Sequence, residues 1–440
     1  MRPMYFIMYF LLKYNLWIFY PRFRHVNRPT KKYTRTIYVS SHAASFMDPL
    51  VIASGQPPLV FFMTRADIFT PLLKPILWAS QMLPIYRQLD GQKTKDKNEK
   101  VFKKCNRILK YGRSLLIFSE GFTDDVFIRR LKPVKKGAVR IGFGALDDIN
   151  WSKNIYIQTI GINYSDPNHV GGDCIISNGE SICLNNYQEA YKNDPNKVVH
   201  ELSSLVEMDM RDQLTDVRNK EMAPFHENIM RITRKGMNAI DSDHSIPLLQ
   251  RYKYSKQLAH WFNENKIEED DDIMELKQEL ETYFTAQKKA SIKESNLYII
   301  LKNKRHKLGE YLFLTLVFPF VLVGLVHHFL PYILIKRFVE KSFKRKVFWG
   351  SVKMMLGAAA ITLFNLPIIF IGYHFIFPSA LLWLAYYFVC IPLVGALTYN
   401  WFNRLKQHKQ LNRLAKKDMS DFVFKRQELV KKIRQLIPVA

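Results

Sequence analysis

The sequence predicts an α/β fold that is followed by charged helices and then by membrane helices. Three observations predict it. Short β-rich runs alternate with polar, helix-patterned stretches over residues 36–164, as in a sheet flanked by helices. Residues 184–307 are charged and helix-patterned, and three long apolar segments occupy the last third of the chain.

The α/β domain is expected over residues 26–183. Residues 91–111, where Lys and Asp alternate before an apolar pattern, predict a helix within it. Four short runs are typical of buried strands: TIYVS, LVFFMT, LLIFS and IYIQTIGINY.

Composition limits the class of protein. The 440 residues include 65 Lys and Arg against 39 Asp and Glu, a formal net charge of +26. Hydrophobic residues make up 48%, which is enough for a sizeable core and excludes a wholly disordered chain. The four cysteines form no CxxC pair and have no metal-ligand spacing, so we expect neither a zinc site nor a disulfide scaffold.

Residues 1–25 begin with an apolar, aromatic run that a basic segment follows. The run is short for a membrane span and lacks a small-residue cleavage site, so we do not expect a signal peptide. We expect a helix in the membrane interface, with its aromatic and basic flanks at headgroup level. The alternative is a buried amphipathic helix of the α/β domain.

Each of three apolar segments is about long enough to cross a bilayer, which takes roughly 20 residues: 311–335, 354–377 and 380–399. The loop 336–353 has seven Lys and Arg and one Glu. The tail from residue 401 has eleven Lys and Arg and three acidic residues. The positive-inside rule places both in the cytoplasm. The last two segments then form a transmembrane hairpin over 350–402, before a basic cytoplasmic helical tail over 403–440.

The first apolar segment has positive flanks on both sides, so it cannot simply cross once. We expect a re-entrant or interfacial hairpin over 308–337, which leaves the α/β domain on the cytoplasmic side, because four residues interrupt the helix: Pro319, His327, His328 and Pro331. For the charged residues 184–307 we expect a helical insert that packs on the α/β domain. A partner-binding segment is the alternative.

Four short motifs carry candidate chemistry, and the first is YVSSHAASFMDP at 38–49. Asp48 before Pro49 predicts a helix start, with the carboxylate at the N-cap and the proline at the first helical position. On a regular helix His42 and Asp48 would lie about 240° apart. In a strand–turn–helix the carboxylate can fold back toward the imidazole, as one that orients a general base does. The alternatives are a turn histidine and a plain cap.

The second and third motifs are MLPIYRQLDG at 82–91 and LLIFSEGFTDD at 115–125. Arg87 is either a bidentate oxyanion ligand or an ordinary surface arginine. Glu120 and Gly121 follow a buried strand. Catalytic groups gather at the carboxyl ends of strands in α/β folds, and glycine lets the backbone approach a ligand closely. The alternative is a strand-to-turn transition with an exposed glutamate.

The fourth motif is FIRRLKPVKKGAVRIGFGAL at 127–146. Its basic residues precede Gly137 and an amphipathic helix: Arg129, Arg130, Lys132, Lys135 and Lys136. Such a cluster at a helix N-terminus favours an anion site through both charge and dipole. The alternative is a basic face toward anionic lipid.

Together, the four motifs resemble those of the glycerol-phosphate acyltransferase superfamily, which includes glycerol-3-phosphate and lysophosphatidate acyltransferases. The resemblance covers roughly residues 26–167, about a third of the chain. The family's blocks fall on His42 with Asp48, on Pro84 with Arg87, on 118–121 and on the IGINYSDP strand at 160–167.

Two features depart from the common family pattern. Five residues instead of four separate His42 from Asp48, and Ser119 replaces the usual proline of the third block. The longer spacing is similar to that of the larger eukaryotic-type glycerol-3-phosphate acyltransferase branch. The expected re-entrant segment, followed by GSVKMMLG before a membrane hairpin, also resembles that branch.

The resemblance implies an acyltransferase-type mixed sheet and attack by a glycerol phosphate hydroxyl on an acyl thioester. His42 would take the hydroxyl proton, and Asp48 would hold the imidazole and stabilise its charged form. The product would belong to phospholipid biosynthesis, with glycerol-3-phosphate or 1-acylglycerol-3-phosphate as acceptor. The implied substrate-binding residues are Arg87, Glu120, Gly121, Arg130, Lys132 and Lys136.

No metal or cofactor is expected, and acyl-CoA or acyl-carrier protein would be the co-substrate. The expected partners are membrane lipid and the glycerol phosphate acceptor, with no nucleic acid. One alternative is an acyltransferase for lysophospholipids with a full headgroup, although the Lys-Lys and Arg-Arg pairs favour a phosphate monoester. The other is a non-enzymatic, basic, membrane-anchored binding protein, in which the ordered motifs would be accidental.

Overall fold

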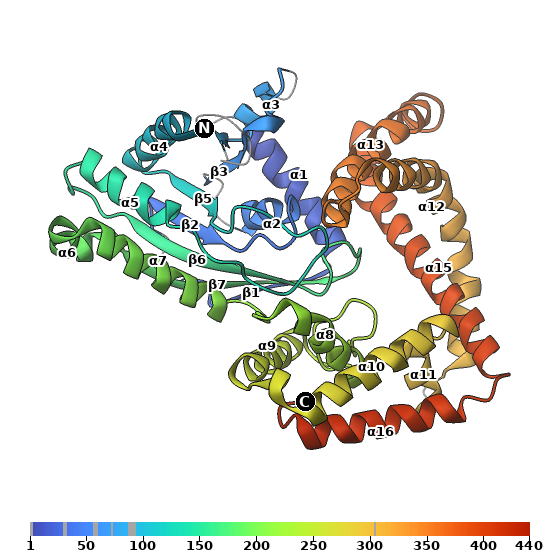
Figure 1. Ribbon diagram of the computed structural model, residues 1–440. Coiled ribbons are helices and arrows are strands. Elements are labelled where there is room, and N and C mark those ends of the chain that lie inside the picture. Colours follow the sequence, from blue (N-terminus) through green and yellow to red (C-terminus); the bar gives the residue numbers. More distant parts are fainter. Residues whose placement is uncertain (1–2, 30–32, 56–59, 72–73, 87–93, 303–304) are drawn as a thin grey trace. The chain divides into compact units, whose positions relative to one another are not determined.

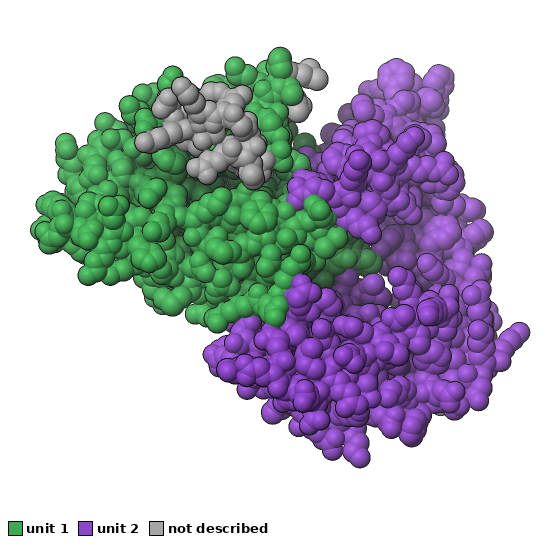
Figure 2. All heavy atoms as spheres, viewed as in Figure 1, with its two compact units in different colours: residues 1–220 green, residues 221–440 purple. Residues whose placement is uncertain are grey.

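The computed structural model describes the whole chain except residues 1–2, 30–32, 56–59, 72–73, 87–93 and 303–304. It contains two compact units, Met1–Lys220 and Glu221–Ala440 (Figures 1 and 2). The first unit continues past the predicted domain boundary at residue 183. Helix α7 (Pro195–Asp212) buries Val199, Leu202 and Val206 in the same core as the sheet.

The first unit contains a mixed sheet, as the family resemblance implied. Its described strands follow the order β1-β7-β6-β2-β5-β3-β4. All neighbouring strands are parallel except β6 and β7, which are antiparallel. The strands are β1 (Arg22–Val26), β2 (Thr36–Ser40), β3 (Val60–Arg65), β4 (Met82–Ile85), β5 (Ser114–Phe118), β6 (Tyr156–Tyr164) and β7 (Asp173–Cys183).

Four of these strands, β2, β3, β5 and β6, coincide with the predicted β-rich runs. The others were missed for physical reasons. β1 is a short edge strand with three basic residues, and β4 contains a proline. β7 contains Asn178-Gly179, which in sequence is a turn signal. Here Gly179 lets the Thr159 and Asp209 side chains lie close to the β7 backbone, because a Cβ at this position would collide with them.

Helices cover both faces of the sheet (Figure 1). Gln213, next to α7, accepts a hydrogen bond from Ser177 of β7. Gly55, at the end of α2 (Met47–Gly55), packs against Ile176, the neighbouring residue of β7. Since successive strand residues face opposite sides, α7 and α2 lie on opposite faces. The remaining helices of this unit are α1 (Pro3–Phe19), α2 (Met47–Gly55), α3 (Lys74–Ala79), α4 (Thr94–Lys110), α5 (Gly137–Asp148) and α6 (Gln188–Asn193).

Helix α1 has one packed face and one exposed apolar face. Tyr5, Leu16 and Phe19 are buried, and the Tyr9 hydroxyl donates to the Ser54 carbonyl in α2 at 3.2 Å. The opposite stripe is exposed: Ile7, Phe10, Leu11 and Trp17. This arrangement suits an interfacial helix that is also anchored to the α/β domain.

The second unit is helical in its described part. The acidic helix α10 packs against the basic tail helix α16, where Lys425 and Lys432 both pair with Glu279, at 3.3 and 3.0 Å. The helices of this unit are α8 (Ala223–Thr233), α9 (Leu248–Glu264), α10 (Asp271–Lys289), α11 (Glu294–Leu301), α12 (Lys307–Ser342), α13 (Trp349–Phe375), α14 (Ala380–Ala385), α15 (Ile391–Leu414) and α16 (Ser420–Leu436).

Among the described residues, three helical segments are long and apolar enough to cross a membrane: Lys307–Ser342, Lys346–Phe375 and Ala380–Leu414. The first of them, α12, is one continuous helix through Pro319 and Pro331. The prediction of a hairpin over 308–337 is therefore wrong. A proline removes one backbone hydrogen bond, but neighbouring helices can compensate, and α12 packs closely along α15 at Gly324.

Candidate active site

The His42 and Asp48 side chains meet across the turn of the strand–turn–helix that the sequence predicted. Strand β2 ends at Ser40, and Ser45 has a φ of 53°, in the left-handed region. This turn reverses the chain before α2 begins at Met47. Asp48 therefore lies within the first helical turn and is not the N-cap that was predicted. Its carboxylate folds back over the turn instead of capping the helix.

Asp48 holds His42 in one tautomer. Asp48 Oδ2 lies 3.1 Å from His42 Nδ1 and also accepts from the Ala44 backbone N–H at 2.9 Å. An ionised carboxylate only accepts, so Nδ1 is the donor, and in the neutral imidazole the lone pair is on Nε2. Asp48 is 1% exposed, whereas the His42 side chain is 23% exposed. The basic nitrogen is thus available to a ligand, and its partner is shielded from water.

Glu120 fixes the position of His42 through the backbone. One carboxylate oxygen accepts from the His42 N–H at 2.5 Å and the other from the Lys132 N–H at 3.2 Å. Glu120 is 2% exposed, and burial raises the pKa of its carboxyl group above the ordinary value. Both oxygens are engaged within the protein, so this side chain joins two motif segments instead of facing a ligand.

The site lies at the carboxyl edge of three adjacent parallel strands. His42 follows β2, Glu120 follows β5, and Tyr164 ends β6. The imidazole stacks on Phe118 of β5, with ring centroids 4.3 Å apart. Side chains from separate motifs converge here because the carboxyl ends of parallel neighbours share one edge.

The basic residues of the fourth motif divide into buried and exposed groups. The Lys132 side chain is 3% exposed, and its ammonium pairs with Asp124 and donates to the Phe122 carbonyl, both at 3.1 Å. Arg130 is about one-quarter exposed and lies 3.9 Å from Asp124. Its Nε is buried without a hydrogen-bond partner among the described residues. Arg130 therefore retains more capacity for an anion than Lys132 does.

Lys136 is exposed at the N-terminus of α5, where the helix dipole favours anions. Gly121 has a φ of 80°, and a Cβ there would collide with Lys135, whose Cε would be 2.9 Å away. The glycine thus lets Lys135 lie across the chain just after Glu120. Arg87, the remaining predicted ligand residue, lies outside the described residues.

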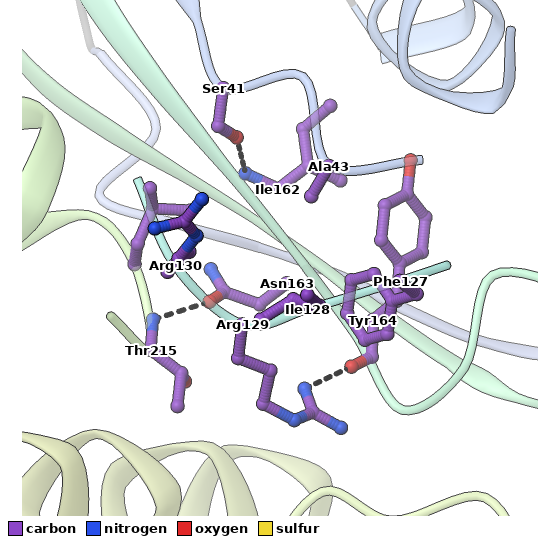
Figure 3. A pocket seen from close by; sticks show the side chains of 11 residues that line it. Ser41, Ala43, Phe127, Ile128, Arg129, Arg130, Ile162, Asn163, Tyr164 and Thr215 are labelled. Carbon is purple, nitrogen blue, oxygen red and sulfur yellow. Dashed lines mark hydrogen bonds between the residues drawn. The ribbon is translucent and has the colours of Figure 1, made fainter. Parts of the chain in front are cut away.

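Two further residues hold this edge together: Tyr164, for which the sequence indicated no role, and Arg129, which it placed in the basic cluster of the fourth motif. The Tyr164 hydroxyl donates to Asp48 Oδ1 at 2.9 Å. Arg129 donates to the backbone carbonyl of Tyr164 (Figure 3) and also to that of Ser165. Both side chains are buried. The position of Tyr164 at the end of a predicted strand was the available signal, but its direction toward Asp48 depends on the sheet register.

A cavity of about 20 Å³ lies beside these residues, large enough for one water molecule (Figure 3). It is lined by Ser41, Ala43, Phe127, Ile128, Arg129, Arg130, Ile162, Asn163, Tyr164, Leu214 and Thr215. The described residues contain no cluster of three or more His, Cys, Asp or Glu that could hold a metal ion.

Comparison with protein families agrees with this geometry. Residues 22–163 match the family model described as Acyltransferase. This segment is an acyltransferase domain of the glycerolipid acyltransferase family. The match includes β1 to β6 and both His42 and Asp48, but it indicates no finer branch. No curated protein matches the chain.

The segment that matches the acyltransferase family ends within β6. Residue 163 falls one position before Tyr164, so β7 and α7 complete the sheet and its core outside the matched segment. The second unit lies entirely outside it. Acyl transfer is thus supported for the first unit, and the second adds the apolar helices.

Proposed function

We propose that the protein is a membrane-bound O-acyltransferase that transfers a fatty acyl group from an acyl thioester to glycerol-3-phosphate or 1-acylglycerol-3-phosphate. The observation that carries this proposal is the His42–Asp48 pair, with Nδ1 and Oδ2 3.1 Å apart, at the strand edge of an acyltransferase domain. The acyl donor is acyl-CoA or acyl-carrier protein.

His42 is the general base of the proposed reaction. Its Nε2 takes the proton of the acceptor hydroxyl while that oxygen attacks the thioester carbonyl carbon. Asp48 stabilises the imidazolium that forms. The tetrahedral intermediate then collapses, the carbon–sulfur bond breaks, and the leaving thiolate receives the proton from His42. The products are an ester and a free thiol, with no covalent acyl-enzyme.

The acceptor phosphate binds the cations on the fourth motif. Arg130 offers a guanidinium suited to bidentate contact, and Lys136 adds charge at a helix N-terminus. Arg87 completes the set, as the family resemblance implies. Lys132 contributes indirectly, since its pairing with Asp124 holds the segment that carries Arg130.

We further propose that the acyltransferase domain lies on the cytoplasmic side of the membrane. The exposed stripe of α1 seats it on the bilayer. Helix α10, before the apolar helices, packs against α16, after them, so both lie on one side of the membrane, and the basic tail favours the cytoplasm for that side. Protease digestion of a C-terminal tag tests this orientation. A tag cleaved in intact cells or sealed right-side-out vesicles would contradict it.

The substrate assignment is tested with membranes that contain the protein, supplied with radiolabelled oleoyl or palmitoyl thioester and one acceptor at a time. We expect acylation of glycerol-3-phosphate or lysophosphatidate above that of membranes lacking the protein. Acylation of lysophosphatidylcholine alone would reject the phosphate monoester and indicate a full-headgroup acceptor. No transfer to any acceptor by folded protein would reject the enzyme itself.

A further inference from the structure

Tyr164 completes the set of hydrogen bonds around Asp48. Its side chain is fully buried at the end of β6, and its hydroxyl lies 2.9 Å from Asp48 Oδ1. The other carboxylate oxygen, Oδ2, receives His42 Nδ1 and the Ala44 N–H. Each oxygen therefore has a distinct role, and rotation of the carboxylate would break all three contacts.

The tyrosine itself is held on several sides. Arg129 donates to the carbonyls of Tyr164 and Ser165, and the Phe127 ring meets the Tyr164 ring edge-on with centroids 6.1 Å apart. Tyr20, the residue after α1, lies with its ring centroid 5.7 Å away. Burial, with the charge of Asp48 beside it, raises the pKa of Tyr164 well above its ordinary value. The phenol therefore remains a donor throughout the physiological range.

We propose that Tyr164 is a positioning residue of the acyl-transfer site, which directs Asp48 Oδ2 at His42 and limits the negative charge that the imidazole experiences. The proposal rests on the proposed function, in which His42 is the base. Tyr164 touches Asp48 and acts through it. The family match ends at residue 163, one position before Tyr164, and the resemblance of the 160–167 strand gave this tyrosine no role.

Loss of the Tyr164 hydroxyl should change the protonation of His42 in one direction, which loss of a purely structural contact would not do. A neutral donor on Oδ1 draws electron density from the carboxylate. Without it, Asp48 attracts a proton on His42 more strongly, so the pKa of His42 rises. The titratable groups that interact with His42 or Asp48 from neighbouring elements are Glu120, Tyr20 and Cys174. Lys132, Asp166 and Asp173 lie beside these three, and the substitution below changes none of the six.

The test compares Tyr164→Phe with Tyr20→Phe in the full-length protein. Both tyrosines are fully buried, but Tyr20 donates to the backbone carbonyl of Pro167, at 3.1 Å, and not to Asp48. The first readout needs no activity: the rate at which diethyl pyrocarbonate modifies His42 is measured against pH by peptide mass spectrometry. We expect the midpoint for His42 to move to higher pH in Tyr164→Phe and to stay unchanged in Tyr20→Phe.

The second readout is the acid limb of kcat/KM for acyl transfer. In Tyr164→Phe this limb should also move to higher pH. The kcat should fall about tenfold to a hundredfold, as expected for loss of a hydrogen bond to a charged group. Where the wild type transfers no acyl group, the proposed function fails. The modification midpoint still decides the role of Tyr164.

The proposal would be overturned if the pH midpoint of His42 modification were the same in Tyr164→Phe and Tyr20→Phe. A loss of kcat in Tyr164→Phe without any change in the acid limb of kcat/KM would overturn it too. Should Tyr164→Phe not fold, 3-fluorotyrosine at position 164 keeps the ring packing and makes the phenol a stronger donor. We then expect the midpoint for His42 to move to lower pH. An unchanged midpoint in the folded fluorinated protein would also reject the proposal.

Discussion

A carboxylate as buried as that of Asp48 is costly unless donors surround it. Asp48 has three donors from two parts of the chain: an imidazole and a backbone amide from the turn after β2, and a phenol at the end of β6. The turn at Ser45, in the left-handed region, brings the first two within reach. The one-residue insertion relative to the common family spacing is thus accommodated by a local backbone conformation, and the His–Asp contact is retained.

At the residue scale, the buried Glu120 carboxyl group should make the stability of the folded protein depend on pH. Its pKa is raised by burial, so the folded protein binds its proton more tightly than the unfolded chain. Protonated Glu120 contributes its full stabilisation below about pH 4.5, the ordinary pKa of a glutamate. This stabilisation is lost as pH rises through the raised pKa of the folded state. In Glu120→Gln that pH-dependent loss disappears.

We therefore expect the difference in unfolding temperature between wild type and Glu120→Gln to change with pH, the wild type losing stability relative to the variant above pH 4.5. Thermal unfolding of the detergent-solubilised protein across pH measures it. The variant loses one acceptor for a backbone N–H, which adds a pH-independent cost of about 1–3 kcal/mol. A difference that stays constant across this range would contradict the assignment.

At the scale of elements, the helix pair α12 and α15 is held by close backbone approach. A Cβ at Gly324 would lie 2.7 Å from the Val394 carbonyl oxygen and would collide with Thr398. His328 Nε2 also lies 2.8 Å from the Ile391 carbonyl oxygen, and Trp401 donates to the Leu314 carbonyl, at 2.8 Å. At Pro331 the lost helical bond is replaced from α13, where the Asn365 side chain donates to the freed His327 carbonyl at 3.2 Å.

Gly324→Leu should therefore destabilise the helix pair by about 1–3 kcal/mol, because the larger side chain forces the helices apart. Gly357→Leu in α13 is the matched control, since a Cβ there meets nothing within 4 Å. The unfolding temperature in detergent is the measurement. Equal stability of the two variants would show that α12 and α15 do not pack in this way.

The elements that the sequence predicted are those whose local pattern and tertiary environment agree. Strands β2, β5 and β6 are apolar and central, so burial and β-propensity point the same way. β1 is an edge strand that depends on pairing with β7, and β7 carries an Asn-Gly turn signal, so the local patterns do not predict either strand. The hairpin expected at α12 was wrong because the proline rule ignores support from a neighbouring helix.

The candidate site shows the same division. Motif spacing identified His42 and Asp48, and the structure brings them together through the turn at Ser45. The residue types of Glu120 and Lys132 suggested substrate contacts, yet backbone amides and Asp124 engage them. Only the register of β6 against β2 reveals Tyr164, because its partner lies on a different segment 116 residues away.

At the scale of the whole molecule, the basic surplus of +26 has more than one destination. Part of it is neutralised within the second unit, where Lys425, Lys432 and Arg426 of α16 pair with Glu279 and Glu294. Another part flanks the apolar helices, as membrane topology requires. The basic residues near the acyltransferase site are a small fraction of the total, so net charge alone says little about the substrate.

In the proposed reaction, acyl transfer depends on His42 as the base. The most direct measurement is therefore the rate of acyl transfer by His42→Ala, beside His200→Ala as a control for an exposed histidine on α7. We expect His42→Ala to lose about 10²–10⁴-fold in kcat, the range for removal of a general base, while His200→Ala keeps wild-type activity. A folded His42→Ala protein that transfers acyl groups at the wild-type rate would contradict the account.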